Sequence, residues 1–168
     1  EQDYGWNGIL VEPNRSFHAS ITSERSSSLD PRAATDGQTK EVRFEEDAHD
    51  GMYSRVASSN VEAEENTGTV DYVVPAASLE QILNDHNAPA WIDYLSIDTE
   101  GTELDVLAGV DWSAREFGFL TIEHNFAPGK EAALDTVLAL KGYRRVLRAL
   151  SEMDSWYVHS RLGERFGP

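Results

Sequence analysis

Residues 91–104 read Trp91-Ile92-Asp93-Tyr94-Leu95-Ser96-Ile97-Asp98-Thr99-Glu100-Gly101-Thr102-Glu103-Leu104. The apolar run that ends at Ile97 has the length of a strand, and residues 98–101 have the composition of a turn. After the turn, Leu104, Leu107 and Ala108 recur at the spacing of the inner face of a helix. The stretch therefore predicts a strand, a tight turn and a helix, which is the repeating unit of an α/β fold.

Strands and helices alternate along the rest of the chain. Further strands are predicted at residues 8–11, 32–35, 41–46, 70–74 and 117–123, and a terminal hairpin at residues 143–147 and 156–159. Helices are predicted at residues 14–24, after the capping residue Ser78, and at residues 132–140. This order predicts one α/β domain over residues 1–168, with a mostly parallel sheet, helices on both faces and a C-terminal antiparallel hairpin.

Composition excludes several classes of protein. The chain has 168 residues, with 30 acidic against 14 basic side chains and a formal charge of −16. That charge argues against binding to nucleic acid or to anionic membranes, because clustered Lys and Arg hold both. The chain has no cysteine, and no apolar run approaches the roughly 18 residues of a membrane helix. Since no export signal is visible at the start, we expect a cytoplasmic protein.

Residues 45–69 form a long polar stretch. They contain Asp50-Gly51, Ser58-Ser59-Asn60 and three closely spaced glutamates. A polar insertion of this length in a compact domain is usually a lid or a mobile functional loop. A solvated loop without a role is the alternative.

Three predicted strands end in the acidic residues Glu12, Asp98 and Glu123. In open α/β sheets, ligands bind outside the carboxyl ends of the strands, so we expect the functional site at this edge. An acid in the position of Glu12 can accept hydrogen bonds from both hydroxyls of a ribose. The alternative is that Glu12 faces solvent beside Pro13.

The turn after residue 97 and the residues after Glu123 carry the groups suited to chemistry. Asp98 and Glu100 lie in the strand-to-helix turn, where carboxylates also serve as helix caps. His124 can take a proton from a substrate hydroxyl, and a structural histidine is the alternative. A metal site built from Asp98, Glu100, Glu123 and His124 is chemically feasible. Nothing in the spacing requires it, so no metal ligand is assigned.

Four segments carry a family resemblance. They read Trp6-Asn7-Gly8-Ile9-Leu10-Val11-Glu12-Pro13-Asn14, then Tyr94-Leu95-Ser96-Ile97-Asp98-Thr99-Glu100-Gly101-Thr102-Glu103-Leu104, then Ile122-Glu123-His124-Asn125, and finally Gly142-Tyr143-Arg144-Arg145-Val146. Together they resemble the FkbM-type methyltransferases, and the second segment is similar to that family's Asp-x-Glu-Gly-x-Glu motif after a strand. The resemblance covers most of residues 6–158, with residues 45–69 poorly matched.

The resemblance implies a Rossmann-like fold and the transfer of a methyl group from S-adenosylmethionine to a hydroxyl of a saccharide or natural-product acceptor. It implies that Glu12 holds the cofactor ribose, that Asp36 lies near the adenine, and that Asp98 and Glu100 lie at the methyl-transfer end. We therefore assign Glu12, Asp36 and Asp98 to the cofactor, and Asp98, Glu100 and His124 to catalysis. The partner is a small-molecule hydroxyl acceptor, with no nucleic acid and no membrane.

The resemblance also implies a first strand and a Gly-rich loop upstream of Trp6, where this sequence has only residues 1–5. We expect the chain to lack that strand, to bind the cofactor weakly, and to pair its free strand edges with a second copy as a homodimer. Two other functions stay open. One is a non-catalytic methyltransferase-like module that self-associates, and the other is a metal-dependent hydrolase that uses the carboxylates and His124.

Overall fold

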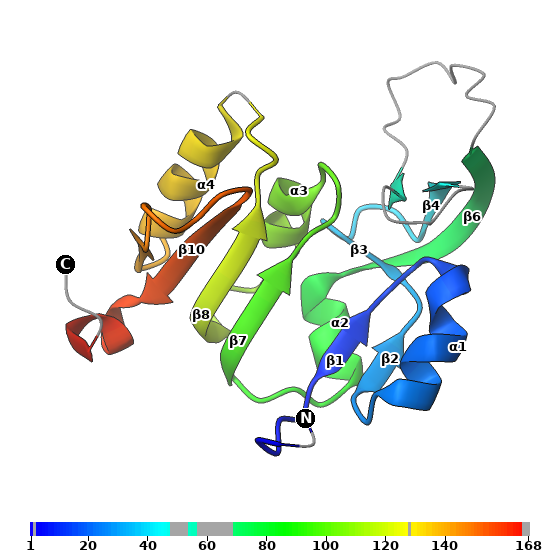
Figure 1. Ribbon diagram of the computed structural model, residues 1–168, viewed down its shortest axis with the longest axis horizontal. Helices are drawn as coiled ribbons and strands as arrows, with labels where there is room; N and C mark the ends of the chain where they lie inside the picture. The colour runs from blue at the N-terminus through cyan, green and yellow to red at the C-terminus, as the bar shows by residue number, and fades with distance from the viewer. Residues whose placement is uncertain (2, 48–53, 57–68, 128, 166–168) are drawn as a thin grey trace. The chain divides into compact units, whose positions relative to one another are not determined.

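The computed structural model describes residues 1, 3–47, 54–56, 69–127 and 129–165. Figure 1 shows the helices and strands, coloured from blue at the N-terminus to red at the C-terminus. Contacts divide the chain into two compact units. The first comprises Glu1–Asn87 and Asp105–Gly109, and the second comprises Ala88–Leu104 and Val110–Pro168. A single domain over residues 1–168 therefore stays a prediction.

The first unit contains two small sheets and two helices. In chain order its elements are β1 (Ile9–Val11), α1 (Arg15–Glu24), β2 (Ser28–Asp30), β3 (Ala33–Thr35), β4 (Glu41–Asp47), β5 (Arg55–Val56), β6 (Thr69–Ser78) and α2 (Leu79–Asp85). β1 and β2 pair in parallel, with α1 connecting them. In the other sheet, of order β3-β6-β4-β5, β3 and β6 are parallel, whereas β4 pairs antiparallel with both β6 and β5.

β2 is a strand that the sequence pattern did not predict, because its residues are mostly polar. Asp30 is 3% exposed and lies at the carboxyl end of this strand. Its carboxylate binds the Arg32 guanidinium at 2.6 Å and His86 Nε2 at 3.0 Å. Because these partners satisfy the buried charge, this polar segment is able to pair as a strand with its last residue buried.

The apolar side chains of the larger sheet form a compact core. Phe44 and Val74 are buried from neighbouring strands, and Tyr72 packs against the Phe44 ring. α2 follows directly and begins as predicted, since the Ser78 hydroxyl accepts a hydrogen bond from Gln81 N–H at 3.1 Å. Its buried face consists of the predicted Leu79, Ile82 and Leu83.

The second unit is built on one four-stranded sheet. Its elements are β7 (Trp91–Ile97), the start of α3 (Glu103–Ala108), β8 (Glu116–Glu123), α4 (Lys130–Ala139), β9 (Tyr143–Val146), β10 (Asp154–His159) and the 3₁₀ helix η1 (Ser160–Arg165). The strand order is β7-β8-β10-β9, with β7 and β8 parallel and the other pairs antiparallel. The predicted C-terminal hairpin is confirmed as β9 and β10. The last four residues of α3 belong to the first unit.

The α/β class is confirmed, but the prediction of a mostly parallel sheet is wrong for the described residues. Three strand pairs are parallel, β1–β2, β3–β6 and β7–β8, and four are antiparallel. The reason lies in the connections, because parallel pairing needs a long crossover whereas β9 returns to β10 through a short loop. Helices on both faces of a single sheet stay a prediction.

Residues 45–69, predicted as a lid or functional loop, are only partly described. Residues 45–47 extend β4, Arg55–Val56 form β5, and residue 69 starts β6. Residues 48–53 and 57–68 lie outside the described residues, and the lid prediction falls largely on them. Among the described helices, none is long and apolar enough to cross a membrane.

Gly109 packs so closely against neighbouring backbone of the first unit that a side chain does not fit there. A Cβ at this position would lie 2.2 Å from the Thr35 carbonyl oxygen and 3.2 Å from Leu79 N. We expect Gly109→Ala to lower the free energy of unfolding by about 2 kcal/mol or more, because the backbone must move to relieve the overlap. Urea denaturation measures this. In the control Gly8→Ala, the new Cβ would lie 3.5 Å from Ser27 Oγ, an ordinary contact. Equal losses in the two variants would contradict the prediction.

Candidate active site

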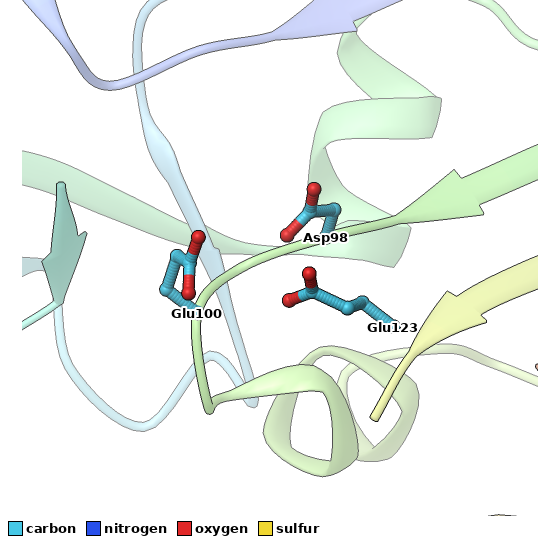
Figure 2. A group of neighbouring side chains, drawn as sticks. All are labelled: Asp98, Glu100 and Glu123. Atoms are coloured by element: carbon cyan, nitrogen blue, oxygen red, sulfur yellow. The ribbon is translucent and has the colours of Figure 1, made fainter. Parts of the chain in front are cut away.

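The parallel pairing of β7 and β8 brings two acidic residues to one edge of the sheet. Ile97 lies opposite Ile122 in the register, so Asp98, directly after β7, and Glu123, the last residue of β8, lie side by side. Glu100 follows in the turn after β7. One carboxylate oxygen from each of Asp98, Glu100 and Glu123 lies within 4.8 Å of the other two. Figure 2 shows these three carboxyl groups close together, and we call them the carboxylate triad.

The backbone after β7 and after β8 adopts unusual conformations close to the triad. Glu100 has a φ of 54° and Gly101 a φ of 122°, both in the left-handed region. Only glycine occupies this region at low cost, so the conformation of Glu100 needs support from its surroundings. Asn125, with a φ of 49°, donates from Nδ2 to Glu123 Oε2 at 2.8 Å and to Glu100 Oε2 at 3.3 Å. This amide therefore links two members of the triad.

The electrostatics of the triad favour a bound proton. Glu123 is 5% exposed, and burial, the hydrogen bond to Asp98 and the negative charges nearby raise the pKa of Glu123 to about 8. Burial and the charge of Asp98 also raise the pKa of Glu100. Glu123 therefore keeps its proton at neutral pH, in a hydrogen bond with Asp98.

Glu123 is the group that sequence reasoning left out of the catalytic assignment. The sequence did mark it as an acid at the end of a buried strand. The sequence alone did not show that Asp98 lies beside Glu123. The pairing of β7 with β8 shows it. The triad is also a set of oxygen ligands of the kind that hard divalent cations bind.

The chain matches the family model described as the methyltransferase FkbM domain over residues 1–159. It belongs to the FkbM methyltransferase family. The resemblance inferred from the four sequence segments is thereby confirmed. Comparison with curated proteins and comparison with solved structures each gave no match.

His124 follows the triad in this FkbM domain but is engaged by other groups. It is 4% exposed, and its Nδ1 accepts a hydrogen bond from Phe126 N–H at 3.1 Å. Its Nε2 lies 3.6 Å from Glu131 Oε1, and its ring packs edge-on against the Phe126 ring. The group of side chains that could hold a metal ion contains Asp98, Glu100 and Glu123 but not His124. The metal site considered from the sequence would therefore have three carboxylate ligands and no histidine. Its role in catalysis stays a prediction.

The other residues assigned to the cofactor, Glu12 and Asp36, lie in the first unit, whereas Asp98 lies in the second. Glu12 follows β1, and its Oε1 accepts a hydrogen bond from Asn14 N–H at 2.7 Å. Asp36 follows β3, and its Oδ1 accepts from Gln38 N–H at 2.9 Å. A carboxylate has about four acceptor positions, so Asp36 retains capacity for further hydroxyl or amine donors. The assignment of these residues to the cofactor stays a prediction.

The raised pKa of Glu123 predicts a stability that falls with pH. The folded protein keeps this proton up to about pH 8, whereas an ordinary glutamate releases it near 4.5. Between these values the folded state binds more protons than the unfolded state, so the free energy of unfolding decreases as pH rises. We expect Glu123→Gln to be more stable than the wild type by up to about 5 kcal/mol above pH 8, and the difference to vanish below the ordinary value.

Urea denaturation at a series of pH values measures this difference. Glu116→Gln is the matched control, because Glu116 starts the same strand and pairs with Arg161. We expect this control to keep the wild-type pH dependence. A Glu123→Gln variant with that same dependence would contradict a proton held by Glu123.

Proposed function

We propose that the chain is an S-adenosylmethionine-dependent O-methyltransferase that acts on a hydroxyl of a small saccharide or natural-product acceptor. The observation that carries the proposal is the match to the FkbM methyltransferase domain over residues 1–159. The carboxylate triad supports it, because the triad supplies proton acceptors at the carboxyl ends of β7 and β8, the edge where ligands of α/β sheets bind.

The residues present suit this cofactor chemically. Glu12 would accept hydrogen bonds from the ribose hydroxyls, and Asp36 would lie near the adenine. The negative charge around Asp98 suits the positively charged sulfonium centre. When bound, the cofactor supplies an activated methyl group, so the protein's own task is chiefly to position the acceptor and to manage its proton.

The Asp98–Glu123 pair is suited to hold the acceptor hydroxyl. The Asp98 carboxyl group lies where its oxygens can accept the hydrogen bond from this hydroxyl and orient it. As Glu123 loses its proton near pH 8, its carboxylate becomes a base that takes the hydroxyl proton during methyl transfer. Asn125 keeps the Glu123 and Glu100 carboxylates in place through its two hydrogen bonds. His124 is the second candidate for the base.

The raised pKa of Glu123 predicts how the rate of methyl transfer depends on pH. We expect the rate to rise with pH through about 8. Asp98→Asn removes the neighbouring charge that raises the pKa of Glu123, so the rising limb moves to lower pH by about one unit or more, and the maximal rate falls roughly 10- to 100-fold. Release of S-adenosylhomocysteine with a panel of glycosides and hydroxylated small molecules measures the rate. A profile that moves with His124→Gln and not with Asp98→Asn would assign the base to His124.

If Glu12 holds the cofactor ribose, the affinity for the cofactor depends on the Glu12 carboxylate. Isothermal titration calorimetry with S-adenosylhomocysteine should show weak but measurable binding by the wild type. Glu12→Gln should bind about 10- to 100-fold more weakly, because it loses charge-assisted hydrogen bonds to the ribose. Glu24→Gln is the control, since Glu24 is an exposed acid at the end of α1. Equal affinity of Glu12→Gln and the wild type would contradict the role of Glu12.

Two further functions have specific observations in their favour. The three carboxylates of the triad suit a metal-dependent hydrolase, and metal analysis of the purified protein with Asp98→Ala as control separates this function from methyl transfer. Among the described strands, β7 pairs on one side only, with β8, which leaves an edge suited to pairing with a second copy. A dimer in light scattering without binding of S-adenosylhomocysteine would favour the non-catalytic module.

A further inference from the structure

Glu103 is a fully buried carboxylate next to the triad, and neither the proposed chemistry nor the sequence assignment uses it. Its side chain is 0% exposed and comes from the first residue of α3. Oε2 forms an ion pair with Lys130 Nζ at 2.5 Å, and the Lys130 side chain is 12% exposed. Although burial works in the opposite direction, the hydrogen bonds from Lys130 and from Gly101 N–H lower the pKa of Glu103. Glu103 is therefore an ionised group held inside the protein.

The other carboxylate oxygen of Glu103 binds the backbone of the turn that carries Glu100. Oε1 accepts hydrogen bonds from Gly101 N–H at 3.0 Å and from Thr99 N–H at 3.3 Å. These two amides flank Glu100, the residue with a φ of 54°. Backbone amides that converge in this way form a small anion-binding concavity, and here a carboxylate of the same chain fills it. The left-handed conformation of Glu100 is thereby supported from both sides.

Lys130 connects this turn to the segment that follows β8. It is the first residue of α4, and the segment between β8 and α4 contains Asn125, which binds both Glu100 and Glu123. The Glu103–Lys130 ion pair therefore joins the two loops that carry the triad and its amide partner. A shift of the turn after β7 would move Glu100 away from Asp98 and Glu123, which now lie within 4.8 Å of it. A shift of the segment before α4 would move Asn125, which binds Glu100 and Glu123.

We propose that the Glu103–Lys130 pair is a positioning device that holds Glu100 opposite Asp98 and Glu123. Glu103 and Lys130 are positioning residues, because they act through the turn and not on a reacting atom. The inference rests on the proposed function only in taking the triad as the proton acceptor. The arrangement itself is testable without cofactor or acceptor.

Two double variants separate positioning from charge. Glu103→Met with Lys130→Met replaces the ion pair by two apolar side chains, an exchange that buried ion pairs often tolerate. Glu103→Gln with Lys130→Met is equally uncharged, but its side-chain oxygen still faces the Thr99 and Gly101 amides. The two double variants thus differ in whether residue 103 still has a side-chain oxygen that accepts hydrogen bonds from the turn. Glu116→Gln and Lys141→Met are single-charge controls from the same unit.

Hydrogen exchange and carboxyl titration by NMR are the measurements. In the wild type, the Thr99 and Gly101 amides should be protected from exchange. In the Met double variant they should exchange at least about tenfold faster, and the pKa of Glu123 should fall toward its ordinary range. The Gln double variant should keep most of the protection and most of the raised pKa, and the two controls should behave like the wild type.

Slow exchange in the wild type and in the Gln double variant, with fast exchange in the Met double variant, would support the positioning role. Unprotected Thr99 and Gly101 amides in the wild type would overturn it without any variant, which also covers a Met double variant that does not fold. Equal behaviour of the two double variants would overturn it as well, because the effect would then come from charge alone. Failure of methyl transfer or of S-adenosylhomocysteine binding would count against the proposed function and would leave these measurements unaffected.

Discussion

The parallel pairing of β7 with β8 is the constraint on which the candidate site depends. In a parallel pair both carboxyl ends point the same way, so residues that follow the two strands emerge together. The register that places Ile97 opposite Ile122 thus forces Asp98 and Glu123 into proximity. Two carboxyl groups this close, one of them buried, cannot both ionise easily. The backbone pairing that builds the sheet therefore also creates the unusual proton affinity at its edge.

The local backbone around this edge carries several of the less favourable conformations of the chain. Glu100, Asn125 and Phe126 all have positive φ without being glycine. Such residues persist where their surroundings determine them strongly. Here the surroundings are identifiable, since Asn125 binds two of the triad carboxylates and the Phe126 amide binds His124. The edge of the sheet that would carry function is held in place by specific polar contacts and not by packing alone.

Much of the fold was predictable from local pattern. The strand–turn–helix of residues 91–104, the Ser78 cap and the C-terminal hairpin all follow from short stretches of sequence. β2 was not, because the charge of its buried residue Asp30 is satisfied only through Arg32 and His86, and His86 lies far from Asp30 in the sequence. Outside that hairpin, the direction of strand pairing was not predictable, because it depends on which strands meet and not on the residues within them.

The sequence by itself determined the membership in the FkbM family, the acids that end the strands and the order of the elements, because these depend on residue type and short-range spacing. Only the tertiary structure decided which acids act together. It joined Asp98, Glu100 and Glu123, left His124 bound to Phe126 and Glu131, and buried Glu103 against Lys130. The physical reason is that the proton affinity of a carboxyl group depends on its burial and on the charges around it, and distant segments of the chain supply both.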